Sequence, residues 1–383
     1  MKNNQRLVAL DVMRGLTIAG MILVNTPGTW SYVYAPLQHA RWNGLTPTDV
    51  IFPFFLFMMG VSMYISLKKC SFHLSSHLLM KIIRRSLILF LIGTAIYALA
   101  TFLGTLRDAC RQPGFEGNPW KEAFASLPGT RIPGVLQRLG VCYGIGSIIV
   151  LTCRHRYIPH LAGGILAGYF LILLFGNGFV HSPENILSVV DRTLFGDNMI
   201  NDGGIDPEGA LSTLPSIAQV LIGFCIGKIC IETPDMREKL NKIFLYGSLM
   251  LIVGWLFSYG CPLNKRVWTP SFVLVTCGFA CLLLGILIWY IDLRKVYKQT
   301  WTFEVFGVNP LFCYVLSEVL AILVDYLPLH SATLHERFYS GFLSNCFGDN
   351  EWTSFLYAFS LLCSVWLIGV LPVSYTHLTL PTI

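Results

Sequence analysis

Residues 49–67 read DVIFPFFLFMMGVSMYISL, and after Asp49 this stretch carries no charged side chain. A helix that spans a bilayer needs about 20 mostly apolar residues, and this stretch approaches that length. The whole chain has the same character, since 54% of its 383 residues are hydrophobic and 13% are charged. An ordinary soluble domain is about 25% charged. The sequence therefore predicts a membrane protein and excludes a set of soluble domains.

Other apolar stretches of similar length occur along the chain, so we expect about ten transmembrane helices. We predict an all-α, polytopic membrane helical bundle in which residues 1–372 form one transmembrane domain. The ten expected spans are 7–26, 49–67, 86–105, 133–152, 159–179, 211–229, 243–261, 271–291, 303–325 and 354–372.

Basic residues are distributed unevenly between the connecting segments. With the N-terminus in the cytoplasm, sixteen Lys and Arg side chains fall on the inner side and nine on the outer side. Cytoplasmic loops are enriched in Lys and Arg, so we predict an N-in, C-in topology. This bias accounts for the net charge of +6, and no nucleic-acid partner is expected.

The last residues differ from the rest of the chain. Residues 373–383, VSYTHLTLPTI, do not continue the tenth span and lack the expected basic flank. This segment resembles the translation of a transposase sequencing adapter. We expect it not to be native, and we exclude it from the functional argument, as for a fusion scar.

The loop between the first two spans concentrates hydrogen-bonding side chains. It contains His39, Trp42 and Asn43, while Asn25 ends the span before it and Asp49 opens the span after it. A neutral imidazole can take a proton near pH 7 or attack an acyl group itself. Asn25 can orient the imidazole or donate to a developing oxyanion. Trp42 and Asn43 resemble a sugar-facing pair of an aromatic ring and an amide.

Residue chemistry alone leaves a second interpretation of this loop open. Trp42 can anchor an interfacial loop in which His39 is merely solvated. Asp49 follows Thr-Pro-Thr, so Thr48 or Asp49 can cap the next helix. Asp49 can also hold the imidazole of His39 through a hydrogen bond.

Several charged and polar residues lie within predicted spans, where they usually face a partner or a water-filled cavity. Asp11 and Arg14 are three residues apart and share a helix face. Arg14 and Arg138 each suit either a structural pairing or an anionic ligand such as a phosphate. Gln137 precedes Arg138, one turn inside the fourth span.

Two further segments contain residues of interest. Asn309 precedes the helix-bending Pro310, and Glu318 lies in the ninth span, where a Glu without a partner would protonate. Residues 262–272, PLNKRVWTPSF, form an expected short outer turn with two cations. Interfacial anchoring is the simplest interpretation of that turn.

Six stretches, in this order, resemble the heparan-α-glucosaminide N-acetyltransferase family, and specifically its bacterial members. They run from residue 10 to about residue 312, and the longest is the most specific. The stretches are LDVMRG (10–15), LVNTPG (23–28), HARWNGLTPTDVIFPFFLFMMGVS (39–62), RIPGVLQRLGVCYG (131–144), PLNKRVWTPSF (262–272) and GVNPLF (307–312).

The resemblance implies transfer of an acetyl group from cytosolic acetyl-CoA to the amino group of a terminal glucosamine on the opposite face. It identifies His39 as the active histidine, as base or acetyl carrier, and Asn25 as its partner. It makes Arg14 and Arg138 the expected contacts for the acetyl-CoA phosphates, and we assign Gln137 and Asn309 to the same ligand. The expected contacts for the acceptor sugar or glycan are Trp42, Asn43, Asp49 and Glu318.

The resemblance also implies a homodimer in the lipid bilayer, here the bacterial cytoplasmic (inner) membrane. The acceptor is left open, because another cell-envelope glycan or transfer to a hydroxyl fits the same chemistry. A membrane transporter of sugars or organic anions is the alternative, with Arg14, Arg138 and Glu318 along its path, and a non-catalytic scaffold is a third. No zinc-ligand spacing, phosphate-binding glycine loop or dinucleotide fingerprint occurs, so we predict no metal.

Overall fold

The computed structural model describes residues 7–113, 115–196, 198–199, 205–297, 300–327 and 332–376, with backbone alone for 371–376. This part of the chain is almost entirely helical, which confirms the all-α polytopic class. The final helix runs to Thr376. Most of the segment expected to be non-native, from 377 to 383, lies outside the described residues.

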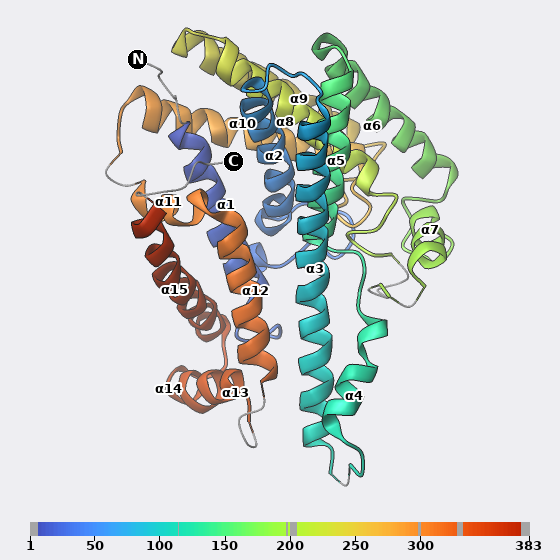
Figure 1. The fold of residues 1–383 in the computed structure, drawn as a ribbon, viewed down its shortest axis with the longest axis vertical. Helices are drawn as coiled ribbons and strands as arrows, with labels where there is room; N and C mark the ends of the chain where they lie inside the picture. Colours follow the sequence, from blue (N-terminus) through green and yellow to red (C-terminus); the bar gives the residue numbers. More distant parts are fainter. Residues whose placement is uncertain are drawn as a thin grey trace.

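Within the described ranges, nine helices are long and apolar enough to cross a membrane. The start of α1 and the end of α15 lie toward the same end of the molecule (Figure 1). The nine helices are α1 (Val8–Asn25), α2 (Ile51–Lys68), α3 (Ser76–Arg111), α5 (Val135–Thr152), α6 (Ile158–Phe175), α8 (Thr213–Glu232), α9 (Met236–Phe257), α10 (Pro270–Leu287) and α15 (Glu351–Thr376).

The predicted span 303–325 is not one straight helix. It forms α11 (Trp301–Val308) and α12 (Pro310–Tyr326), which are bent by 85° relative to each other. Pro310 has no backbone N–H and disfavours helical geometry in the residue before it. Asn309 accordingly leaves the helical region, with φ −125° and ψ 61°. With this pair counted as one span, the structure holds up to the ten expected crossings among its described residues.

The predicted span 86–105 is the middle of a much longer helix. Helix α3 has 36 residues, about 54 Å at 1.5 Å per residue, and runs along most of the long axis of the molecule (Figure 1). The hydroxyl of Ser75 caps its start by accepting from the Leu78 N–H. Because the hydrocarbon core is about 30 Å thick, part of α3 must extend beyond it.

Short helices connect and cover the long ones. They are α4 (Pro119–Ala125), α7 (Ile186–Phe195), α13 (Leu334–Phe338) and α14 (Ser344–Phe347), with 3-10 turns η1 (Ala35–Leu37), η2 (Pro47–Val50), η3 (Leu127–Gly129) and η4 (His155–Tyr157), and π-helical segments η5 (Ile288–Leu293) and η6 (Tyr339–Leu343).

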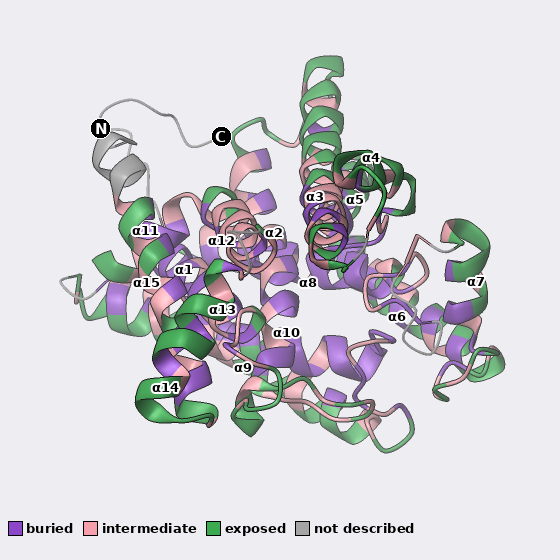
Figure 2. Cartoon of the chain, turned by 90° about the horizontal axis from the view of Figure 1, so that it is seen from below, coloured by how far each residue is buried: buried purple, intermediate pink, exposed green. Residues whose placement is uncertain are grey.

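Helices α2, α8 and α10 form the interior of the bundle, and α3 and α9 lie at its edge. Two thirds of the most apolar part of α8 and of α10 is buried, against 17% for α3 and 22% for α9. In Figure 2 buried residues gather along α1, α8 and α10, while α4 and α14 are mostly exposed. The exposed apolar side chains of α3 and α9, among them Leu87, Leu91, Ile252 and Leu256, are those that lipid would cover.

Glycines bring the central helices into backbone contact. A Cβ added to Gly223 of α8 would lie 2.1 Å from the Phe57 carbonyl oxygen, and one added to Gly60 of α2 would lie 2.0 Å from the Val220 carbonyl oxygen. Small residues at helix crossings allow the close packing on which helix association in membranes depends. A Cβ on Gly307 of α11 would similarly lie 1.8 Å from the carbonyl oxygen of Asp11 in α1.

We predict that Gly223→Ala destabilises the bundle, because the new methyl group must push α2 and α8 apart. Overpacking of this kind costs about 1–3 kcal/mol. Thermal unfolding in one detergent should show a lower midpoint for this variant than for the unmodified protein. Gly168→Ala on α6 is the matched control, since nothing lies within 4 Å of its added Cβ. Equal midpoints for both variants would contradict the close-packing interpretation.

Candidate functional site

The candidate site is built around a histidine–aspartate pair at the start of α2. The imidazole Nδ1 of His39 lies 2.7 Å from Oδ1 of Asp49. The His39 side chain is 46% exposed, whereas that of Asp49 is 1% exposed. Since an ionised carboxylate only accepts hydrogen bonds, a hydrogen bond in this contact requires the imidazole proton on Nδ1. The other ring nitrogen, Nε2, then carries a free lone pair.

The Asp49 carboxylate is fixed by the same residues that start the helix. Its Oδ2 accepts from the Thr46 N–H at 3.1 Å, the Thr46 hydroxyl at 2.9 Å and the Ala40 N–H at 3.1 Å. Thr46 and Asp49 form a capping box at η2, so the two interpretations of Asp49 from the sequence, helix cap and histidine partner, hold together. Its side chain is 1% exposed, and both of its oxygens have hydrogen-bond partners within the protein.

Three loops meet around this pair. The Gly44 N–H donates to the Leu263 carbonyl at 2.8 Å. The indole N–H of Trp42 donates to the Phe179 carbonyl at 3.1 Å, and its ring stacks on His181 with centroids 4.5 Å apart. Residues 39–49, 177–181 and 262–269 therefore form one assembled surface, although they are far apart in sequence. One face of the Trp42 ring is occupied within this surface.

Asn43 is more exposed than Trp42, the other member of the expected sugar-facing pair. Its side-chain oxygen accepts from Asn264 Nδ2 at 3.3 Å, and the rest of the side chain is exposed. The Asn43 amide is thus held from one side and open on the other.

Lys265 belongs to the site, although the sequence indicated only an interfacial turn there. Its Nζ lies 3.1 Å from His39 Nδ1 and 3.7 Å from Asp49 Oδ1. Burial lowers the pKa of the Lys265 ammonium, and the nearby negative charges of Asp49 and Glu208 act in the opposite direction. Lys265 is 226 residues from His39, so no local sequence pattern could have joined them.

A buried ionic network lies beside this surface. The Arg131 guanidinium contacts Asp206 at 2.6 and 3.1 Å, Glu208 at 2.6 Å and the Tyr97 hydroxyl at 2.9 Å. The Asp206 side chain has no exposed area and that of Arg131 is 16% exposed. Carboxylates so close to a guanidinium raise the pKa of Arg131 further, although burial alone would lower it. This network ties the segment before α8 to α3 and to the start of α5.

Gln137 and Arg138 lie inside the protein, close to this network. Arg138 is 2% exposed, lies 5.0 Å above the Trp268 ring, and donates from Nη2 to the Gly209 carbonyl at 3.0 Å and to Ser212. Its Nε and Nη1, and both amide atoms of Gln137, have no hydrogen-bond partner among the described residues. Buried polar atoms without a partner usually mark a bound ligand or water.

Glu318 and Asn309 are placed by the broken helix pair. Glu318 lies on α12, near enough to Tyr97 and Tyr314 for its charge to act on both. Because Tyr97 also binds Arg131, Glu318 borders the buried ionic network. Asn309 lies at the 85° bend itself, between α11 and α12.

Asn25 and Arg14 both belong to α1. Asn25 is the exposed last residue of α1, and no hydrogen bond joins it to His39 within the described chain. Arg14 pairs with Asp11 at 2.8 Å and donates to Ser62 on α2. Ser62 and Asp49 are thirteen residues apart, about 20 Å along a helix. Arg14 and His39 therefore mark two well-separated ends of the same helix.

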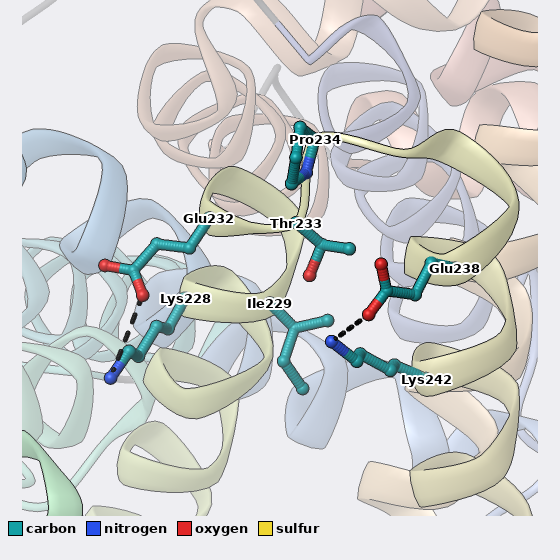
Figure 3. Close-up of a pocket in the computed structure, with 7 residues that line it drawn as sticks. All are labelled: Lys228, Ile229, Glu232, Thr233, Pro234, Glu238 and Lys242. Carbon is teal, nitrogen blue, oxygen red and sulfur yellow. Dashed lines mark ion pairs between the residues drawn. The ribbon is translucent and has the colours of Figure 1, made fainter.

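A cavity of about 430 Å³ lies at a third place, between the end of α8 and the start of α9 (Figure 3). Ion pairs join Lys228 to Glu232 at 3.8 Å and Lys242 to Glu238 at 2.6 Å along its wall. Ser212, which binds Arg138, is twenty residues before Glu232, about 30 Å along α8. The cavity is thus remote from His39, and its two lysines are balanced by two glutamates.

A second histidine–aspartate pair holds the start of the His39 loop. His335 of α13 lies with Nδ1 2.6 Å from Asp325 Oδ1 and with Nε2 2.8 Å from the Gly28 carbonyl. The ring also stacks on Tyr357, with centroids 4.6 Å apart. Burial lowers the pKa of His335, but the bonds to Asp325 and Gly28 raise it overall above 6.5. Since both neighbours are acceptors, the ring is an imidazolium that joins α12 and α13 to the loop after α1.

The nine apolar helices among the described residues define a multi-pass membrane protein, and it carries an exposed imidazole in contact with a buried carboxylate. A family model described as heparan-alpha-glucosaminide N-acetyltransferase, catalytic, matches residues 6–255. That match covers more than half of the chain, including His39 and Asp49, and the chain belongs to this family.

Two curated relatives agree with this assignment. The chain is 28% identical to heparan-alpha-glucosaminide N-acetyltransferase of Mus musculus over 380 residues, covering 82% of this chain and 54% of the relative. It is also 28% identical to the Homo sapiens protein of the same name over 376 residues, covering 82% and 53%. The chain thus spans about half the length of the curated relatives it matches.

We predict that His335→Gln lowers the thermal midpoint in detergent near pH 6 and has a smaller effect near pH 9. The pKa of His335 is raised in the folded protein, so its stabilisation is complete below the ordinary value of 6.5 and is lost as pH rises through the raised value. His77→Gln, at an exposed position, is the control. A loss of stability that is the same at both pH values would exclude the imidazolium.

Proposed function

We propose that this chain is a transmembrane N-acetyltransferase that moves acetyl from cytosolic acetyl-CoA to the amino group of a glucosamine-type sugar at the outer face. The observation that carries the proposal is the 2.7 Å contact between His39 Nδ1 and Asp49, which leaves Nε2 free on a half-exposed ring. Membership of an N-acetyltransferase family supports the choice of acyl transfer over other reactions of a histidine base.

The free Nε2 of His39 serves two related routes. As a general base it takes the proton of the acceptor amine while the amine nitrogen attacks the thioester carbonyl, and the C–S bond then breaks to release CoA as its thiol. As an acetyl carrier Nε2 attacks the thioester carbonyl first, and the C–S bond breaks to release CoA thiolate. The amine then attacks the acetyl carbon, the imidazole leaves as its neutral form, and the amine proton passes to the thiolate. In both routes Asp49 stabilises the positive ring, and we assign Asn25 as the donor to the oxyanion.

The distance between Arg14 and His39 supports entry of acetyl-CoA from the side of the membrane opposite to His39. The phosphates of CoA cannot cross roughly 30 Å of hydrocarbon, but a thin thioester arm can reach from a phosphate site to the histidine. Arg14, about 20 Å along α2 from Asp49, is the proposed phosphate contact. Arg138, whose Nε and Nη1 have no partner among the described residues, is the second proposed phosphate contact, and Gln137 and Asn309 are assigned to the same ligand.

We assign the acceptor to the surface of the three loops. The open amide of Asn43 and the edge of Trp42 would contact the sugar, and Glu318 would attract its amine through the ionic network. The proposal includes an N-in, C-in homodimer in a bacterial cytoplasmic membrane. Transfer to a hydroxyl of a cell-envelope glycan uses the same surface and differs only in the acceptor.

A transporter of sugars or organic anions is the second candidate, and one observation favours it. Broken helices near the bilayer midplane form the substrate sites of many secondary transporters, and α11 and α12 form such a pair with an 85° bend. Uptake of labelled glucosamine into proteoliposomes without acetyl-CoA would support this candidate over the enzyme.

We predict that His39→Ala abolishes transfer of labelled acetyl from acetyl-CoA to glucosamine by the purified protein. Asp49→Asn should lower kcat by about 10²- to 10⁴-fold, because the amide cannot stabilise the imidazolium. His77→Ala is the matched control at an exposed histidine, and all variants are compared for thermal midpoint.

The possible results separate the proposals. Full activity in His39→Ala would remove His39 from the chemistry. Acetyl trapped on the His39 peptide in the absence of acceptor would select the carrier route, and its absence during full turnover would select the base. If acetyl-CoA binds and no transfer to glucosamine occurs, hydroxyl acceptors are tested next.

A further inference from the structure

Seven cations lie at the end of the molecule where α2 leads into α3 and α5 leads into α6. Figure 1 shows both connections at this end. The rings of Phe72 in the first connection and His155 in the second contact each other, with centroids 4.3 Å apart. All seven residues are exposed, and together they are called the basic surface. They are Lys68, Lys69, Lys81, Arg84, Arg85, Arg154 and Arg156.

An aromatic cluster fixes the two connections to the bundle. The ring centroid of Tyr64 on α2 lies 5.2 Å from that of Phe72 and 5.0 Å from that of Phe224 on α8. The His155 ring lies 5.2 Å from the Phe224 ring. Ser71 and Phe72 keep positive φ values of 51° and 53°. Non-glycine residues keep such a conformation only where their surroundings hold it, so the cations on either side are presented by a fixed backbone.

The segments that carry the basic surface contain no acidic residue. Residues 50–107 and 123–183 lack Asp and Glu, and none of the seven cations forms an ion pair with a carboxylate of the described residues. Glu232, at the nearby end of α8, pairs with Lys228 instead. At the other end of α3, Arg111 pairs with a carboxylate at 2.6 Å. The basic surface therefore differs from the other cations in that its positive charge is available to an anion.

One face of α3 carries two of these cations and then a row of apolar side chains. Lys81 and Arg84 come first, and the apolar side chains follow at steps of three and four residues, which keeps all of them on one face. The apolar residues are Leu87, Ile88 and Leu91, which are 54%, 41% and 55% exposed. Lys81 and Leu91 are ten residues apart, about 15 Å along a helix, which is half of the roughly 30 Å hydrocarbon core. This order and this length match a phospholipid, whose charged head and apolar chains occupy one leaflet.

We propose that the basic surface binds anionic phospholipids, with the headgroup phosphate at Lys81 and Arg84 and the acyl chains along the apolar side chains of the same α3 face. Arginine and lysine bind phosphate through charge-assisted hydrogen bonds, and basic clusters beside a transmembrane helix attract anionic lipids. Lys68 and Asp49 are nineteen residues apart, about 28 Å along a helix, so the basic surface is remote from His39. Lipid binding there does not depend on acetyl transfer. Cations that only orient the chain in the membrane would show no preference among lipids.

Native mass spectrometry of the purified protein in a nonionic detergent tests this surface. Titration with dioleoyl phosphatidylglycerol and, separately, with dioleoyl phosphatidylcholine should show tighter binding of the anionic lipid. In the double variant Lys81→Gln/Arg84→Gln, the affinity for phosphatidylglycerol should fall about fivefold for each cation removed, and the affinity for phosphatidylcholine should not change. Arg107→Gln/Lys121→Gln is the matched control, since it removes the same charge at the other end of α3 and on exposed α4. This control should bind phosphatidylglycerol like the unmodified protein.

A charge-preserving variant, Lys81→Arg/Arg84→Lys, should keep the preference for phosphatidylglycerol, and all variants are compared for thermal midpoint without added lipid. If the double glutamine variant does not fold, Lys81→Gln and Arg84→Gln should each lose about fivefold in affinity. Equal affinity of the unmodified protein for both lipids, unchanged affinity in the glutamine variants, or an equal loss in the matched control would overturn the site. Displacement of phosphatidylglycerol by an equal concentration of CoA would assign the cations to a soluble nucleotide and overturn the lipid as their ligand.

Discussion

The Asp49 carboxylate is the interaction on which this site depends. A buried carboxylate is costly unless hydrogen bonds replace the water it loses, and Asp49 obtains them from Thr46, Ala40 and His39. These bonds start α2, close the loop from 39 to 49 and orient the imidazole at once. Since α2 packs along α8 through Gly60 and Gly223, the histidine is fixed to the most buried part of the bundle. As the proposed base, His39 would need little reorganisation when it reacts.

The two histidine–aspartate pairs have the same residue types but differ in the neighbours of the imidazole ring. His39 has one carboxylate neighbour and a cation beside it, so one ring nitrogen stays free. His335 has an acceptor at each nitrogen, Asp325 and the Gly28 carbonyl, so both are used for attachment. The second pair anchors the start of the loop that carries the first. Both pairs thus contact the single connection between α1 and α2, one at Gly28 and the other at His39.

Several charged and polar side chains lie inside the membrane bundle. Arg14 contacts Ser62 within α2, whereas His39 contacts Asp49 just before the start of α2. Charged groups in such positions need partners, and Arg14 has Asp11 while Arg131 has Asp206 and Glu208. Arg138 and Gln137 differ, because several of their buried polar atoms have no partner among the described residues. They are the natural place for a polar ligand between the two ends.

The sequence by itself determined the class and most of the helices, because length and apolar character are local properties of a span. The motif around His39 also identified the loop, and Asp49 was expected both at the helix cap and as the histidine partner. The N-cap residue itself is Thr46 and not Thr48, whose hydroxyl donates to the Pro36 carbonyl. Pro310 marked the position of the break at Asn309 in the sequence, but the 85° angle of the break and the length of α3 were decided by the tertiary structure, since packing partners set how sharply a chain turns and where a helix ends. Lys265, the Arg131 network and His335 were also invisible in the sequence. Their partners lie from tens to more than three hundred residues away, and only folding brings such charges within a few ångströms of one another.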